Sequence, residues 1–180
     1  MTPERYKGVK WEDAPEKVRE MFQATFETRR GMYIHGEVGT GKTHIAYALK
    51  GRFDDPSKGR WSRFWNTTEL LREIRRDFDR SPYEKTHADS ELMRYDGLLF
   101  LDDVGSEKIS DWVAETFYMI VNRRYTEMLP TIITSNLPIP ALAERIGDRT
   151  ASRIVEMCEI VELVGPDRRI QNQKKTTINL

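Results

Sequence analysis

Residues 36–43, which read GEVGTGKT, constrain the fold of this chain more than any other feature of its sequence. They match the phosphate-binding pattern G-x-x-x-x-G-K-[ST] at every fixed position. In this pattern the glycines let backbone N–H groups turn toward phosphate oxygens, and the start of the next helix adds a partial positive charge. A short apolar stretch, 32–34, precedes the run, and a segment typical of a helix, 44–49, follows it. The run therefore predicts a nucleotide-binding loop between a strand and a helix.

Two acids at the end of an apolar run provide the second part of a nucleotide site. Residues 97–101 are continuously apolar, which is typical of a strand buried on both faces of a parallel sheet, and Asp102 and Asp103 follow them. Asp102 can hold Mg²⁺ together with the Thr43 hydroxyl, while Lys42 can reach the β- and γ-phosphates. Asp103 can activate the attacking water as a general base. A solvated acidic turn is the ordinary alternative, and the phosphate loop disfavours it.

Two further polar groups could complete the site. Asn136 follows another apolar segment, 131–135, and its amide could hydrogen-bond the γ-phosphate or the attacking water; it could equally begin a turn. Arg149 and Arg153 lie four residues apart and so share a helix face. Arginine stabilises a phosphoryl group in transfer, even when a neighbouring subunit supplies it. A solvated helix with salt bridges explains the same two arginines, so both interpretations stay open.

Strand and helix patterns alternate along the chain. Apolar runs predict five strands at 32–35, 62–65, 97–101, 131–135 and 159–163. Apolar stripes and capping residues predict helices at 15–30, 42–51, 66–78, 90–95, 110–125 and 140–157, the last broken near Gly147. Five strands separated by helices indicate a doubly wound α/β sheet, in which ligands bind beyond the carboxyl ends of the strands.

The composition narrows the possible functions. The chain has 180 residues, which suits one domain, and its 29 basic and 29 acidic residues balance, so any nucleic-acid site must be a local patch. Its single cysteine, Cys158, excludes an internal disulfide, and the three histidines show no metal-ligand spacing. No apolar run approaches the length of a membrane span, and no signal-peptide core is present. We therefore expect a cytoplasmic protein that does not contact a membrane.

In their order and spacing these motifs resemble the AAA+ ATPases. More narrowly, they resemble the branch that holds the DnaC/DnaI-type helicase loaders and the IstB-type transposition ATPases. The similarity rests on the phosphate loop followed by His44, on LLFLDDVG at 98–105, and on 115–136, where NRRY ends a helix and PTIITSN follows. It covers about residues 6–164.

The resemblance implies a P-loop NTPase fold with five parallel strands in the order 5-1-4-3-2, and ATP or ADP with Mg²⁺ as cofactors. It implies that Asp102 is the Walker B metal acid, Asp103 the catalytic acid and Asn136 the first sensor. It further implies that Arg153 is an arginine finger acting in trans, with Arg149 as the runner-up. The nucleotide-binding residues so expected are Gly36, Glu37, Val38, Gly39, Thr40, Gly41, Lys42, Thr43 and His44; the metal ligands are Thr43 and Asp102.

The resemblance also predicts how the chain is divided. We expect an N-terminal linker and helix at 1–30, an ATPase core at 31–165 and a polar tail at 166–180. The tail holds Arg168 and Arg169, and the lid domain of other AAA+ proteins is expected to be absent or minimal. The segment before the first helix, with Tyr6, Lys7 and Trp11, is a candidate to lie near the adenine.

The predicted function is that of an ATP-hydrolysing domain of a replicative helicase loader. It would assemble into a ring or helical filament and act on single-stranded DNA and on a helicase, the latter through an N-terminal domain missing from this chain. An IstB-like transposition ATPase, a P-loop nucleotide kinase and a non-hydrolysing nucleotide-dependent scaffold are the alternatives. Aromatic side chains beside arginines suit contact with single-stranded DNA, because bases stack on the rings. The same residues could instead belong to the core or to a solvated helix face. These candidates for DNA contact are Arg60, Trp61, Arg63, Arg72, Arg75 and Arg76.

Overall fold

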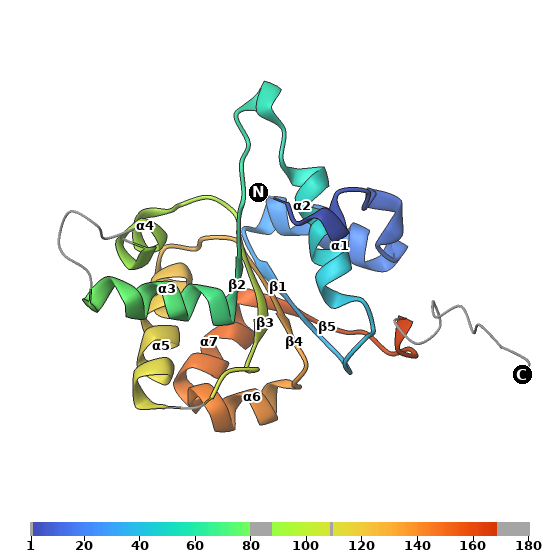
Figure 1. Ribbon diagram of the computed structural model, residues 1–180. Helices are drawn as coiled ribbons and strands as arrows, with labels where there is room; N and C mark the ends of the chain where they lie inside the picture. The colour runs from blue at the N-terminus through green and yellow to red at the C-terminus, as the bar shows by residue number, and fades with distance from the viewer. Residues whose placement is uncertain (1, 80–87, 109, 169–180) are drawn as a thin grey trace, which may run out of the picture.

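Five parallel strands form the centre of the computed structural model, which describes residues 2–79, 88–108 and 110–168 (Figure 1). The strands lie in the order β2-β3-β4-β1-β5, and every neighbouring pair is parallel. This confirms both the α/β class and the predicted order. The strand bounds are β1 (Gly31–His35), β2 (Arg63–Asn66), β3 (Leu99–Val104), β4 (Thr131–Ser135) and β5 (Cys158–Glu162).

Helices cover both faces of the sheet. In β1, Met32 and Ile34 pack into one apolar cluster and Tyr33 into the other, because successive side chains of a strand point to opposite faces. The first cluster includes α1 (Glu16–Thr28) and α2 (Lys42–Phe53). The second includes the remaining α-helices, namely α3 (Thr67–Asp79), α4 (Ala88–Arg94), α5 (Asp111–Thr126), α6 (Ile139–Ile146) and α7 (Asp148–Met157). Short 3-10 helices lie at Glu4–Tyr6, Trp11–Asp13 and Pro56–Lys58.

Local signals place most helix ends where the sequence predicts them. The Ser110 hydroxyl accepts a hydrogen bond from the Val113 N–H at 3.3 Å and caps α5. Gly147, with φ at 87°, separates α6 from α7. The side chain of Phe78, the last residue of the predicted helix 66–78, lies outside the described residues, and so does the tail beyond residue 168, including Arg169. The predicted boundaries at residues 30 and 165 stay predictions.

The third strand differs most from its prediction. β3 begins at Leu99, two residues later than expected, and continues through Asp102 and Asp103 to Val104. Its register with β4 shifts between Leu101 and Val104, and Asp103 has a φ of 61°. A bulge of this kind bends a strand and re-aims its side chains. The two acids therefore belong to an irregular strand end rather than to a turn after it.

None of the described helices is both long and apolar enough to cross a membrane.

The single cysteine is buried in the sheet. Cys158 is 1% exposed in β5, and burial raises the pKa of its thiol to about 12. It therefore acts as a small apolar residue, as the sequence predicts.

Arg124 connects α5 to the end of the sheet where β3 and β4 begin. Its guanidinium is buried and donates to the Thr131 hydroxyl at 2.6 Å and to three carbonyl oxygens, those of Tyr95 at 3.0 Å, Gly97 at 2.6 Å and Pro130 at 2.8 Å. Burial lowers its pKa to about 10, so the group still carries its charge at neutral pH.

Replacing Arg124 by Leu is expected to lower the free energy of unfolding by about 3 kcal/mol, because buried carbonyl oxygens lose their donor. Urea unfolding followed by circular dichroism measures this. Arg123→Leu is the matched control: Arg123 pairs with the exposed Asp96 at 2.9 Å, so its loss should cost less than about 1 kcal/mol. Equal losses in the two variants would contradict the bracing role of Arg124.

Candidate active site

The phosphate loop joins β1 to α2 in a conformation that glycine permits. Gly39 and Gly41 have φ values of 86° and 96°, in the left-handed region that favours glycine. A Cβ atom at Gly39 would lie 2.0 Å from the carboxyl carbon of Asp167, and one at Gly36 would lie 2.2 Å from the carbonyl oxygen of Leu163. The loop is therefore shaped both by its own backbone and by the chain segment that follows β5.

Lys42 begins α2 with its ammonium group turned back onto the loop. The side chain is largely buried, and Nζ donates to the carbonyl oxygens of Gly36 at 2.8 Å and Glu37 at 2.7 Å. Such donors can transfer to phosphate oxygens when an anion enters the loop. The geometry fits the role that the sequence motif predicts for this lysine.

Asp102 lies where the phosphate loop and the centre of the sheet meet. The Thr43 hydroxyl is 3.0 and 3.1 Å from its two carboxylate oxygens, and the Thr134 hydroxyl donates to Oδ1 at 2.7 Å. Asp102 is 4% exposed, and its burial raises the pKa of the carboxyl group despite these two hydrogen bonds. A carboxylate beside a threonine hydroxyl offers the hard oxygen donors that Mg²⁺ prefers, and a cation there would favour the charged form.

Asp103 and Asn136 are brought together by the pairing of β3 with β4. The amide Nδ2 of Asn136 donates to Oδ1 of Asp103 at 2.9 Å, and the Asp103 N–H donates to the Thr134 hydroxyl at 2.9 Å. Thr134 thus contacts both acids. The positive φ of Asp103 is a local strain of the kind that collects at functional sites. Of the two interpretations of Asn136, the structure favours the one that places it in the site.

These groups line one cavity of about 890 Å³, which is large enough for a nucleotide. Of the residues that the sequence singles out, it is lined by Val38, Gly39, Gly41, Lys42, Thr43, His44, Asp102, Asp103 and Asn136. Hydrogen bonds within the loop involve the other three residues of the motif, Gly36, Glu37 and Thr40. The carbonyl oxygens of Gly36 and Glu37 accept from Lys42, and the Thr40 hydroxyl donates to the Glu37 carbonyl at 2.9 Å. His44 lies 3.4 Å from the Asp13 carboxylate.

Sequence reasoning missed several residues of the cavity wall. Tyr47 lies one helical turn after Thr43, a spacing that could have identified it. Its ring stacks between Tyr6 and Phe64 at centroid distances of 4.4 and 4.2 Å, and burial, followed by the charge of Asp102, raises its pKa to about 12. Thr134 precedes the SN pair in the strand that the sequence identifies, yet it resembles an ordinary strand residue.

Arg168 also lines the cavity, although the sequence gives no basis for choosing it within a polar tail. Its backbone N–H donates to the Gly39 carbonyl at 3.0 Å, and its guanidinium Nη1 lies 3.2 Å from the position of a Cβ at Gly41. The segment after β5 thus reaches the phosphate loop and places the positively charged guanidinium group of Arg168 beside it.

The aromatic residues proposed for the adenine separate in the structure. Tyr6 lines the cavity, whereas Trp11 packs 6.0 Å from the ring of Phe22, with the guanidinium groups of Arg19 and Arg52 over it. Lys7 and Trp11 are not among the residues that line the cavity. The N-terminal segment therefore contributes Tyr6 to the wall and Trp11 to the core.

Arg149 and Arg153 do not reach the cavity of their own chain. Both lie on α7, where the Arg153 guanidinium rests 4.8 Å from the ring centroid of Tyr118 and 5.7 Å from that of Tyr125. α7 ends where β5 begins, so its N-terminus lies near the carboxyl ends of the strands. The phosphate loop, which follows β1, lies at the same end of the sheet. Neither arginine therefore contributes its side chain to the cavity wall of its own chain.

Known proteins resemble this chain in sequence and in fold. The chain is 25% identical over 154 residues to the replicative helicase loader DnaI of Bacillus subtilis, which covers 78% of this chain and 48% of that protein. It is also 25% identical to a putative ATP-binding protein of insertion sequence IS21 from Pseudomonas aeruginosa, covering 89% of this chain and 61% of that protein. The first curated relatives are matched over 48% to 61% of their lengths, so this chain spans only part of them.

A solved structure and a family model complete the comparison. The crystal structure of the DnaC helicase loader superposes with a TM-score of 0.77 at 26% identity, covering 90% of this chain and all of that one. The fold is thus that of the P-loop AAA+ proteins. The model of the IstB-like ATP-binding protein family matches residues 10–176. The chain belongs to the IstB-like family of ATP-binding proteins.

Proposed function

We propose that this chain binds ATP with Mg²⁺ and hydrolyses it as the motor domain of a helicase-loader-type protein. The contact between Asn136 and Asp103, beside the Thr43–Asp102 pair, supports this most strongly. It combines a carboxylate and an amide in the wall of a nucleotide-sized cavity. Such a pair suits the positioning of water.

Each proposed role follows from where the side chain lies. Lys42 and the backbone N–H groups of the loop hold the β- and γ-phosphates, and Thr43 and Asp102 hold the cation. The cation, when bound, neutralises charge that develops on the phosphate oxygens. Asp103 accepts a proton from the attacking water, while Asn136 fixes the carboxylate and contacts the γ-phosphate or the water.

The site needs a further positive charge, and we propose that Arg153 of a neighbouring subunit supplies it. Hydrolysis would then depend on assembly into a ring or filament. Arg149, one turn nearer the start of α7, is the second candidate. This role of Arg153 requires that its side chain leave the rings of Tyr118 and Tyr125 when subunits meet.

Arg153→Ala is expected to bind ATP with unchanged affinity and to lose about 10³-fold in phosphate release. Mixing it with Lys42→Ala tests the trans arrangement, since one variant retains the finger and the other retains the phosphate site. The mixture should regain phosphate release that neither variant shows alone. Normal release by Arg153→Ala, or a mixture that stays inactive, would reject the assignment. Arg149→Ala should release phosphate at the wild-type rate, and a loss there instead would make Arg149 the finger.

The partners are also part of the proposal. The relative DnaI is named as a replicative helicase loader, and on this basis we propose a helicase and single-stranded DNA as partners, with a role in DNA replication in the cytoplasm. A role in transposition is the second candidate, favoured by the IS21 relative and by the family model. Stimulation of phosphate release by a purified replicative helicase would favour loading, and stimulation by duplex transposon ends would favour transposition.

Two enzymatic alternatives predict different products from ATP. A nucleotide kinase would transfer the phosphoryl group to a nucleoside monophosphate, and a scaffold would bind ATP without releasing phosphate. Incubating the protein with ATP and each monophosphate, and following phosphate and diphosphates separately, distinguishes all three. We expect free phosphate and no transfer, because an acid and an amide suited to positioning water contact each other in the wall of the cavity.

A further inference from the structure

The segment between α2 and β2, residues 54–62, projects away from the rest of the molecule and carries an exposed tryptophan (Figure 1). Trp61 is 60% exposed, whereas Trp65, four residues later in β2, is partly buried against the core. Large aromatic side chains dominate the core of most folds. The nucleotide site does not account for the exposure of this indole, because none of residues 54–62 lines the cavity.

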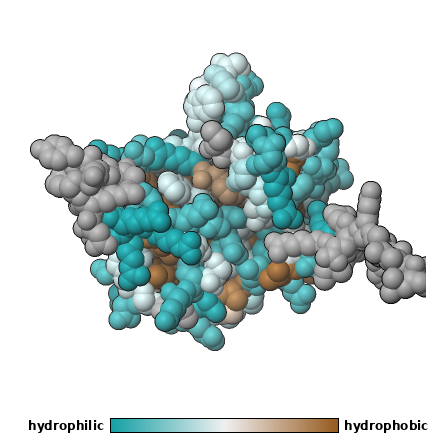
Figure 2. Space-filling view, in the orientation of Figure 1, coloured by the Kyte–Doolittle hydropathy of each residue, from teal (hydrophilic) through white to brown (hydrophobic). Residues whose placement is uncertain are grey.

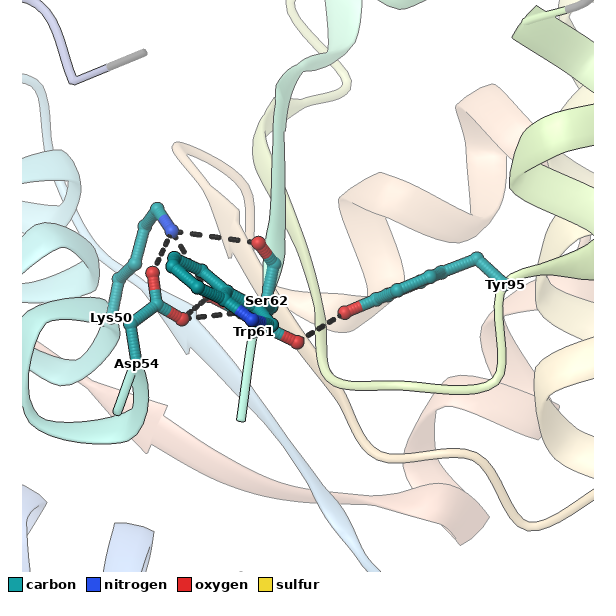
Figure 3. A network of polar contacts seen from close by, with 5 residues as sticks. All are labelled: Lys50, Asp54, Trp61, Ser62 and Tyr95. Atoms are coloured by element: carbon teal, nitrogen blue, oxygen red, sulfur yellow. Dashed lines mark hydrogen bonds and ion pairs between the residues drawn. The ribbon is translucent and has the colours of Figure 1, made fainter. Parts of the chain in front are cut away.

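The base of the projecting segment is held rigidly on both sides (Figure 3). Asp54 accepts hydrogen bonds from the Ser62 N–H at 2.8 Å and the Ser62 hydroxyl at 2.7 Å, and it pairs with Lys50 of α2. On the other side, the Tyr95 hydroxyl donates to the Trp61 carbonyl at 2.5 Å, and Figure 3 shows the indole on the side of the chain away from Tyr95. The backbone at Trp61 is fixed while its ring remains accessible, which lowers the entropy lost when a partner binds.

The surroundings of Trp61 are basic. Residues 50–63 contain five lysines or arginines and two aspartates, a net charge of +3 in a chain whose total is zero. Of the five basic residues, Lys50 is paired with Asp54 and Arg63 with Glu91. Lys58 and Arg60 both pair with Asp55, at 3.1 and 3.6 Å, yet their side chains remain 66% and 41% exposed. A chain with no net charge needs a local basic patch of this kind to bind a nucleic acid.

Trp61 is the only large apolar side chain of residues 50–63 that is exposed. The remaining large ones among the described residues are Val38, Met119, Met128, Val155, Ile160 and Val164, and none comes from residues 50–63. In Figure 2 the projection is hydrophilic to neutral on the visible face. A protein-docking site needs an apolar centre of several residues. One aromatic ring among cations suits an unpaired base and its phosphates better.

We propose that Trp61 stacks on an unpaired base of single-stranded DNA, with Lys58 and Arg60 beside the phosphate backbone. The inference deepens the DNA-coupled function proposed above by naming where the strand lies. Lys58, Arg60 and Trp61 do not line the nucleotide cavity, so the strand and ATP do not compete for the same groups.

The first test compares affinities for a fluorescein-labelled oligothymidylate by anisotropy, with a non-hydrolysable ATP analogue present. Trp61→Ala should bind about 10-fold more weakly than the wild-type chain, and Trp61→Phe should stay within about threefold because it keeps a ring. Met128→Ala, which removes a side chain that is also 60% exposed, should not change the affinity. Matching circular dichroism melts exclude misfolding, and the behaviour of Trp61→Phe separates loss of stacking from loss of structure.

The second test separates stacking from charge by the dependence of affinity on salt. Trp61→Ala should leave the slope of log affinity against log salt unchanged, whereas Lys58→Ala should reduce it by about 0.7. Wild-type affinity in Trp61→Ala, or no binding by the wild-type chain at low salt, would overturn the proposal. So would a loss of self-association in Trp61→Ala with DNA binding intact, since the tryptophan would then be a protein contact.

Phosphate release without DNA, measured on the same samples, keeps this proposal distinct from the proposed function. Trp61→Ala should release phosphate at the wild-type rate. If the wild-type chain binds DNA through Trp61 but releases no phosphate, the hydrolytic function fails and the stacking site stands.

Discussion

Asp103→Asn is expected to bind ATP as the wild-type chain does and to release phosphate about 10²- to 10⁴-fold more slowly. The amide cannot accept the proton of the attacking water, although its oxygen can still accept the hydrogen bond that Asn136 donates at 2.9 Å. Asparagine also tolerates the left-handed backbone at this position, where φ is 61°. The variant therefore removes the chemistry and keeps the geometry.

Glu69→Gln is the matched control for Asp103→Asn, because Glu69 is another acid that lines the cavity. Its phosphate release should stay within about threefold of the wild-type rate, since a charge away from the transferred group adds little to general base catalysis. Release is measured in single-turnover reactions, and affinity is measured by calorimetry with ATP. If Asp103→Asn and Glu69→Gln hydrolyse ATP equally well, Asp103 is not the base.

Lys42→Ala should weaken ATP binding by at least about 100-fold and abolish phosphate release. A charged hydrogen bond contributes about 1.5–3 kcal/mol, and this ammonium group can make two of them to the phosphates. In the structure those donors rest on the Gly36 and Glu37 carbonyl oxygens, 2.8 and 2.7 Å away. Titration with a fluorescent ATP analogue measures the loss.

A lysine at the other end of the same helix provides the control for Lys42→Ala. Lys50 pairs with Asp54 and does not line the cavity, so Lys50→Ala should bind the analogue normally. Melting curves verify that Lys42→Ala is folded, because its removal also leaves two loop carbonyls without their donor. An affinity for ATP within about threefold of the wild-type value in folded Lys42→Ala would contradict the phosphate-binding role.

The sequence predicts those parts of the site that lie in short contiguous motifs. The phosphate loop fixes the position of Thr43, and an apolar strand fixes that of Asp102. The order of the sheet then brings them within hydrogen-bonding distance, at 3.0 Å. Asn136 could be identified as a candidate, but only the pairing of β3 with β4 shows that its amide contacts Asp103.

The parts that sequence alone cannot predict depend on contacts between distant segments. The bulge in β3 arises from its register with β4, and no residue type signals it. Arg168 reaches Gly39 only because the segment after β5 folds back over the phosphate loop. Trp61 and Trp65 look alike in the sequence, yet one is exposed and the other packs on the core.

Phosphate release per subunit, followed as protein concentration rises with and without single-stranded DNA, tests the central claim most directly. The claim is that this chain hydrolyses ATP at a site that a neighbouring subunit completes. It predicts a rate per subunit that is low for the monomer, rises steeply with concentration and changes when DNA is added. A high rate per subunit that is independent of concentration, or a rate that stays near zero at every concentration with and without DNA, would contradict it.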